Sequence, residues 1–144
     1  MTDETADTEP VVELDEAESW NLLGSESLGR LATTVGSALD IFPMNYYAAD
    51  GKIVVRTGEG TKLSELSVNP SVAFEADHVQ GESAWSVVAH GTARVLVNSG
   101  EIAAADELPL TPWIPTLKYN YVEIDVSKIS GRRFMFGPEP QRYY

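Results

Sequence analysis

The clearest pattern of apolar positions lies in the second half of the chain. Apolar or small residues occupy every second position from Trp85 to Val97, which is the period of a strand that buries one face. Gly91 stands in the middle of this stripe, and a glycine inside a long strand indicates a bend or bulge. The stripe predicts a long, curved strand of the kind that forms a barrel corner.

Shorter segments between turn residues predict further strands, and three segments predict short helices. Asp50-Gly51 is a strong hairpin signal. Asp15 can cap the first helix, with Glu18 in the capping-box position and Gly24 at its end. The other strands are expected at 28–35, 39–47, 52–57, 71–79, 119–126 and 129–136, and the helices at about 15–24, 61–68 and 98–108.

Six or seven antiparallel strands with short helices between them favour a mainly β fold, a closed or nearly closed barrel. Closure would remove the exposed edges that a flat sheet would leave. The length of 144 residues suggests one domain. We expect it at residues 13–137, after a disordered acidic tail at 1–12 and before a C-terminal tail at 138–144.

The composition excludes several classes of site and partner. The chain has no cysteine, which excludes disulfides, zinc-thiolate sites, iron–sulfur clusters and cysteine nucleophiles. The formal net charge of −12 repels nucleic acid, a partner of many small β-barrels. The sequence has neither a long apolar run nor a basic, apolar leader. We therefore expect a soluble cytoplasmic protein that contacts no membrane and no nucleic acid.

The most informative stretch runs from Arg56 to Lys62, with the sequence Arg-Thr-Gly-Glu-Gly-Thr-Lys. A strand ends in Arg56-Thr57 and a helix begins at Thr61-Lys62, with two glycines between them. Two cations, two hydroxyls and the free amides of a helix N-terminus all favour a phosphate. The spacing fits neither a nucleotide P-loop nor the dinucleotide fingerprint. The pattern predicts a phosphate site of another kind, against the simpler alternative of a solvated basic turn.

A second stretch, Pro43-Met44-Asn45-Tyr46, lies on the strand that pairs with the one ending at Arg56. A planar ring along this strand could have its phosphate held by the neighbouring strand. One face of the stretch, which includes Met44, is expected to belong to the core, and the other face is free to contact a ligand.

These stretches, in this order and spacing, resemble the flavin-binding split-barrel family related to pyridoxamine 5′-phosphate oxidase. The resemblance covers about residues 15 to 136. Its further elements are Leu28-Gly29-Arg30-Leu31-Ala32, Leu63, Asn69-Pro70, Val72-Ala73-Phe74-Glu75 and the strand from Trp85 to Ala93.

The resemblance implies a six- to seven-stranded split barrel that forms a homodimer with flavin mononucleotide (FMN) at the subunit interface. It implies a flavin-dependent oxidoreductase that acts on a small-molecule redox substrate. Basic and aromatic residues that hold the substrate's phosphate in the oxidase itself have no match after Gly131, so we do not expect pyridoxamine phosphate oxidase activity. The implied cofactor-binding residues are Pro43, Met44, Asn45, Tyr46, Arg56, Thr57, Thr61, Lys62, Trp85 and Ser86.

Two alternatives stay open from sequence. A deazaflavin-dependent reductase would use the same barrel and phosphate site, although the negative charge disfavours the polyanionic tail of that cofactor. A non-catalytic flavin- or haem-binding module is the other, with His78 or His90 as a haem ligand. The sequence contains no acidic cluster spaced to complete a metal site with either histidine, and it identifies no catalytic residue.

Overall fold

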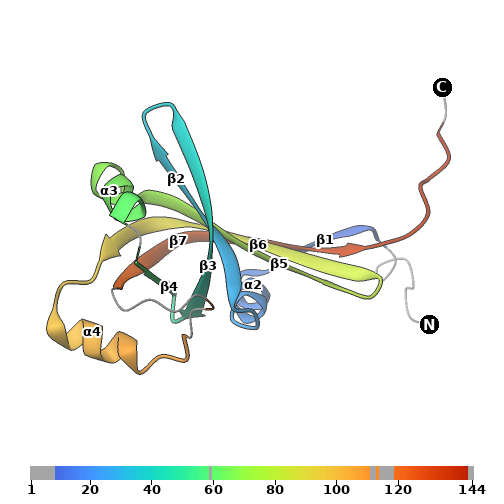
Figure 1. The fold of residues 1–144 in the computed structure, drawn as a ribbon. Coiled ribbons are helices and arrows are strands. Elements are labelled where there is room, and N and C mark those ends of the chain that lie inside the picture. The colour runs from blue at the N-terminus through green and yellow to red at the C-terminus, as the bar shows by residue number, and fades with distance from the viewer. Residues whose placement is uncertain (1–8, 59, 111–112, 114–118, 143–144) are drawn as a thin grey trace.

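A computed structural model describes residues 9–142 except 59, 111–112 and 114–118 (Figure 1). Within these residues, seven strands form one antiparallel sheet, with three short helices at the connections. In chain order the elements are β1 (Val11–Leu14), α2 (Glu16–Leu23), β2 (Leu28–Val35), β3 (Ala38–Ala49), β4 (Lys52–Thr57), α3 (Gly60–Val68), β5 (Ser71–Gln80), β6 (Ser83–Val95), α4 (Ser99–Asp106) and β7 (Asn120–Met135).

Six of the strands close into a barrel. The order along the sheet is β7-β4-β3-β2-β5-β6, and β6 pairs again with β7 to complete the ring. The predicted hairpin at Asp50-Gly51 is confirmed, because both residues adopt positive φ between β3 and β4. The predicted mainly β split barrel is thus confirmed.

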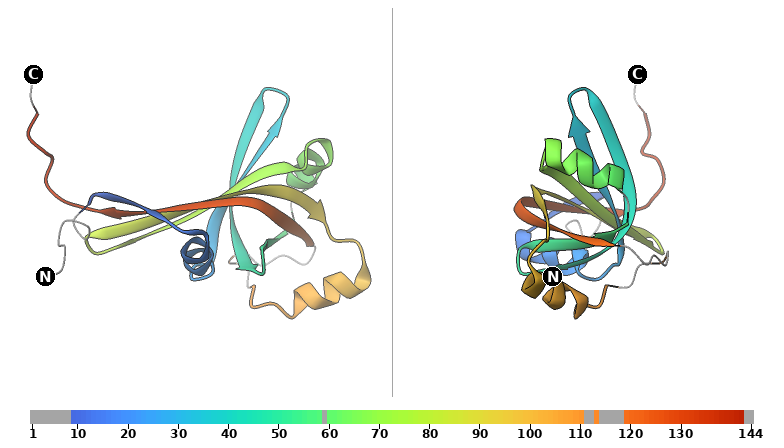
Figure 2. Two further views of the ribbon diagram at one scale, coloured as in Figure 1. Left: turned by 180° about the vertical axis from the view of Figure 1, so that it is seen from behind. Right: turned by 60° about the vertical axis from the view of Figure 1, so that its left-hand side comes forward.

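The barrel is split where β6 and β7 bend. The β6–β7 register shifts between His90 and Gly91, which confirms the bulge expected at Gly91. Beyond the bulge the two strands leave the barrel as an arm, together with the end of β5 and with β1 (Figures 1 and 2). The β2–β3 hairpin projects from the barrel in another direction.

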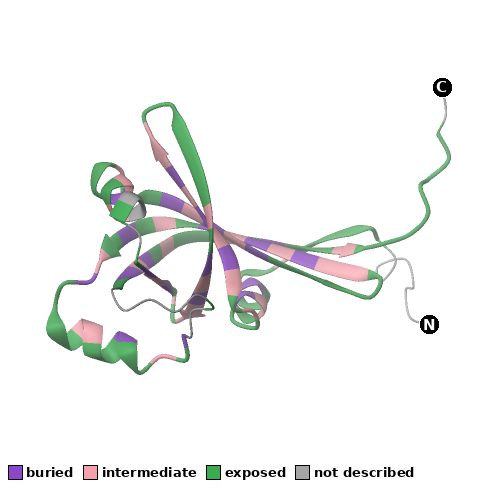
Figure 3. Ribbon diagram, in the orientation of Figure 1, coloured by how far each residue is buried: buried purple, intermediate pink, exposed green. Residues whose placement is uncertain are grey.

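The core follows the inward-facing alternation of the strands. Phe74 and Ile124 are fully buried inside the ring, and Val87 is fully buried on the arm, on the face covered by α2. A smaller cluster lies outside the ring, where α4 packs over Val54 and Tyr121. Figure 3 shows the buried positions alternating with exposed ones along the strands. None of the described helices is long and apolar enough to cross a membrane.

Two strand assignments from sequence are wrong. Val11 and Val12, which we placed in the disordered tail, belong to β1 and pair with Phe134 and Arg133 of β7. This pairing depends on a strand about 120 residues away in the sequence, so the four residues of β1 alone do not predict it. The two strands expected at 119–126 and 129–136 are one continuous strand, β7, because Gly131 lies within the strand. Of the rest of the tail, Glu9 and Pro10 lie in no helix or strand, and residues 1–8 lie outside the described residues.

The first helix forms as its cap predicts. The Asp15 carboxylate accepts a hydrogen bond from the Glu18 amide at 2.8 Å, and the helix ends at Gly24. The last turn presents the Leu23 carbonyl, which accepts a hydrogen bond from the Tyr46 hydroxyl at 2.6 Å. Burial, followed by the charge of Glu26, raises the pKa of Tyr46 above its ordinary value. The phenol therefore stays protonated and ties α2 to β3.

Replacing Tyr46 by phenylalanine is expected to lower the free energy of unfolding by about 1–2 kcal/mol, because the buried Leu23 carbonyl loses its donor. Urea unfolding followed by circular dichroism measures the change. Tyr47→Phe is the matched control, since Tyr47 lies on the outer face of the same strand, and it should change stability by less than about 0.5 kcal/mol. Equal losses in the two variants would contradict the assigned role.

Candidate functional site

The candidate cofactor strand, β3, divides its four predicted residues between two faces. Met44 and Tyr46 are buried in the core, with 8% and 2% of their surface exposed. Pro43 and Asn45 alternate with them and face outward. The expectation that one face belongs to the core and the other is open is therefore confirmed. Only Pro43 and Asn45 can offer side chains to an external ligand.

Asn45 is held by two hydrogen bonds from opposite sides. Its amide nitrogen donates to the Ser27 carbonyl at 3.0 Å, and its side-chain oxygen accepts from the Trp113 backbone amide at 2.9 Å. These contacts fix the side chain between the start of β2 and the segment that follows α4. Asn45 therefore has a fixed position on the outer surface of β3.

Arg56 lies beside Asn45 on the neighbouring strand. Tyr46 pairs with Val55, so the residues on either side of that pair, Asn45 and Arg56, stand at the same level. The guanidinium of Arg56 is 3.7 Å from the ring centroid of Tyr119, a cation–π contact that fixes its plane. Its Nε is buried and has no hydrogen-bond partner among the described residues. A buried charged donor of this kind favours an anionic ligand.

The tyrosine against Arg56 belongs to a small polar cluster with α4. Asp106 accepts hydrogen bonds from Tyr121 at 2.6 Å and from Tyr119 at 3.2 Å. The two rings meet edge to face with centroids 5.4 Å apart. Burial, and then the hydrogen bond with Asp106, raises the pKa of Tyr121 to about 12. The Tyr121 phenol therefore stays protonated, and the hydrogen bond to Asp106 holds Tyr119 over Arg56.

The remaining residues of the predicted phosphate junction lie differently. Thr57 is buried on the inner face of β4, the opposite side from Arg56. Thr61 and Lys62 fall in the first turn of α3, which begins at Gly60, but their side chains lie outside the described part of the structure. The junction is confirmed as a strand end followed by a helix start. Among its described side chains, only Arg56 faces outward at the level of Asn45.

The last two predicted residues, Trp85 and Ser86, lie on the arm. Trp85 is buried on the face that joins the core, and Ser86 faces the other way into a groove. Pairing across β3, β2, β5 and β6 runs from Pro43 through Arg30 and Glu75 to Val88. Three strand steps put Val88 about 14 Å from Pro43. Within one chain, Ser86 and the β3 surface therefore do not meet.

The sequence matches the profile of the pyridoxamine 5′-phosphate oxidase family over residues 15–133. The chain belongs to this family. The resemblance drawn from the motifs on β2, β3, β4 and β6 is thereby confirmed, and the split barrel agrees with it.

Two solved structures and one further protein, all from bacteria, are similar to this chain. A pyridoxamine 5′-phosphate oxidase candidate from Corynebacterium glutamicum superimposes with a TM-score of 0.84 at 48% identity, over 91% of this chain and 98% of that one. The FAD binding protein from Mycobacterium smegmatis does so with a TM-score of 0.76 at 41% identity, over 88% and 100%. The uncharacterized protein Rv3129 of Mycobacterium tuberculosis is 40% identical over 90 residues, 62% of this chain and 82% of that protein.

The candidate site includes two residues that the sequence patterns did not indicate. Asp106, at the end of α4, accepts hydrogen bonds from both Tyr119 and Tyr121. The ring of Tyr119 stacks on the guanidinium of Arg56. Both contacts depend on the path of the chain after α4, which no local motif records. The tyrosines at 119 and 121, two apart on one strand face, are the only hint the sequence offers.

The two histidines lie away from this cluster. His78 Nδ1 is 2.9 Å from a carboxylate oxygen of Glu26, so this side chain already has a partner. His90 is exposed on β6 next to the bulge and pairs with Ala73 of β5. The two stand on different strands, and neither faces the Arg56 surface.

Proposed function

We propose that the protein binds a flavin nucleotide, FMN in the first place, and acts as a flavin-dependent oxidoreductase on a small-molecule substrate. The observation that carries the proposal is Arg56, whose buried Nε has no hydrogen-bond partner among the described residues. Its guanidinium is already fixed by Tyr119. A phosphate in reach of this group would supply the missing acceptor.

The residues around Arg56 have distinct tasks in this proposal. Arg56 holds the phosphate, with the backbone amides at the start of α3 as a second source of donors. Pro43 and the fixed Asn45 form the surface along which the ring lies. The flavin would supply the redox chemistry, while the protein binds and orients it. Catalytic side chains remain unassigned.

We further propose that the working unit is a homodimer with the flavin at its interface. Leu39, Ile41 and Trp113 are 81%, 67% and 67% exposed, which is unusual for large apolar side chains unless a partner covers them. Leu39 and Ile41 lie on the same face of β3 as Pro43. A second copy would also explain how Ser86 could approach a ring on β3, because in its own chain Ser86 lies two residues beyond Val88, three strands away from Pro43.

The cofactor is tested by titrating flavin-free protein with FMN and, separately, with FAD, followed by removal of the excess. Retained bands near about 370 and 450 nm, at about one flavin per chain, are expected because both flavins present the same ring and ribityl phosphate. The Mycobacterium smegmatis relative is an FAD binding protein, so FAD is the specific competitor. Tighter retention of FAD than of FMN would correct the choice of cofactor and keep the flavin site.

Other outcomes would contradict parts of the proposal. Retention of neither flavin would contradict it, and selective retention of a deazaflavin would move the protein to that class of reductase. A sharp band near about 400 nm in the purified protein would indicate haem instead. Reduction of the bound flavin by a nicotinamide nucleotide no faster than that of free flavin would contradict that nucleotide as the donor. Gel filtration that gives a monomer with flavin bound would contradict the dimer.

A further inference from the structure

The arm carries a groove that shares only Ser86 with the proposed flavin site. The groove has a volume of about 350 Å³ and lies on the face of β6 and β7 that points away from α2. This volume is at the lower end of the range for small-molecule sites. The strand register sets Ser86 opposite Arg132 and Val88 opposite Ser130, so two hydroxyls and a guanidinium stand together. Phe134, two residues beyond Arg132, closes one end.

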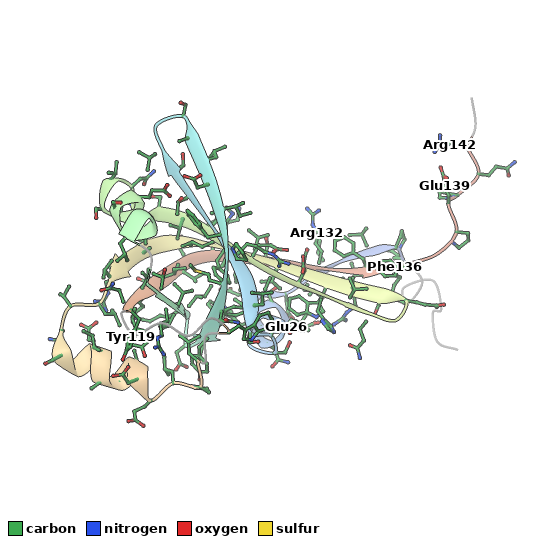
Figure 4. All side chains as sticks on the ribbon, in the orientation of Figure 1. Glu26, Tyr119, Arg132, Phe136, Glu139 and Arg142 are labelled. Carbon is green, nitrogen blue, oxygen red and sulfur yellow. The ribbon has the colours of Figure 1, made fainter. Side chains whose placement is uncertain are left out.

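Arg132 is the cation of this groove. Its side chain is exposed, projects from the arm in Figure 4, and forms no ion pair with any described residue. The planar guanidinium fork matches a carboxylate through two parallel hydrogen bonds. The ring of Phe134 offers an apolar surface to whatever carries that carboxylate. The groove thus combines an anion-binding fork, hydroxyl groups and an aromatic wall.

The surrounding charges restrict which anion can enter. Glu75 and Asp77 lie on the same face of the sheet, and Arg30 already binds both, at 2.9 and 3.3 Å. Glu13 of β1 stands opposite Arg132 in the register. Arg30 offsets Glu75 and Asp77, which leaves Arg132 beside the carboxylate of Glu13. One guanidinium matches a monoanion in charge, whereas a phosphate dianion would leave a second negative charge unbalanced next to Glu13.

We propose that the groove beside Ser86 binds a small aromatic carboxylate, with the carboxylate on Arg132 and the ring against Phe134. Its use as the substrate subsite rests on the proposed flavin function, because Ser86 would bring the ligand next to the ring. Binding of the carboxylate itself does not depend on flavin.

The test uses benzoate as the probe and the full chain without flavin. Saturable binding, measured by ligand-observed NMR, is expected for the native sequence. Arg132→Ala should weaken it about tenfold or more, because a charge-assisted pair is lost. Arg133→Ala is the matched control, since the neighbouring arginine points to the opposite face of the same strand. Its affinity should equal that of the native protein. Glu13→Gln should strengthen binding a few-fold by removing the competing carboxylate.

Three results would overturn the inference. They are absence of saturable benzoate binding to the native chain, unchanged affinity in Arg132→Ala, and equal losses in Arg132→Ala and Arg133→Ala. Displacement of benzoate by inorganic phosphate at lower concentrations than by a second aromatic carboxylate would also overturn the choice of a monoanion. Benzoate binding without flavin retention would contradict the proposed function and support the carboxylate site. Flavin retention without benzoate binding would support the proposed function and contradict the carboxylate site.

Discussion

Replacing Arg56 by alanine is expected to weaken FMN binding by about 100-fold, because two charge-assisted hydrogen bonds of about 1.5 kcal/mol each are lost. The expectation follows from the position of the guanidinium, fixed by Tyr119 and with an unused buried donor. Titration of FMN against intrinsic or flavin fluorescence measures the change. Arg56→Lys should recover only part of the affinity, because an ammonium group cannot reproduce the planar fork.

Two comparisons make this experiment specific for the phosphate. Riboflavin has the same ring and ribityl chain but no phosphate, so its weaker binding should be nearly unchanged in Arg56→Ala. Lys52→Ala removes a cation from the same strand, at the end where it is paired with Glu123 at 3.0 Å, and should leave FMN affinity intact. Equal losses for FMN and riboflavin would mean that Arg56 only supports the fold around Tyr119. FMN affinity in Arg56→Ala equal to that of the native protein would contradict the assignment of the phosphate site to Arg56.

The framework of the barrel could be predicted because its signals are local. Gly91 stands inside a period-two stripe and does mark the bulge, and Asp50-Gly51 does turn β3 into β4. The alternation on β3 correctly separates buried Met44 from its outward neighbours. Each of these inferences needs only the geometry of one strand or one turn.

The contacts that define the site could not be predicted, because they join segments whose approach depends on the whole fold. Asp106 reaches two tyrosines from a helix outside the barrel. Thr57, assigned to the phosphate with Arg56, points into the barrel because adjacent strand residues face opposite sides. The groove at Arg132 arises only after β7 has joined β6 along its full length. A sequence pattern names residue types at such a site but not which faces they share.

Substitution of Gly91 by alanine is expected to lower the free energy of unfolding by about 3 kcal/mol or more. A Cβ atom at this position would stand 2.2 Å from the Asp125 carbonyl oxygen and 2.9 Å from its carbon. The clash is with backbone, so no rotamer change relieves it, and the close approach belongs to the β6–β7 pairing that closes the barrel. Relief would require the two strands to separate at the bulge, with loss of ladder hydrogen bonds.

Chemical denaturation of Gly91→Ala beside Gly137→Ala separates this steric effect from the general cost of replacing a glycine. A Cβ at Gly137 would meet no atom within 4 Å, so that variant should stay within about 0.5 kcal/mol of the native protein. If Gly91→Ala fails to accumulate as folded protein while Gly137→Ala does, the direction of the effect is the same and its size exceeds the measurable range. Equal stability of the two variants would mean that the barrel can open at the bulge without cost. The arm could then swing relative to Arg56, and the distance between Ser86 and the β3 surface would no longer argue for a second subunit.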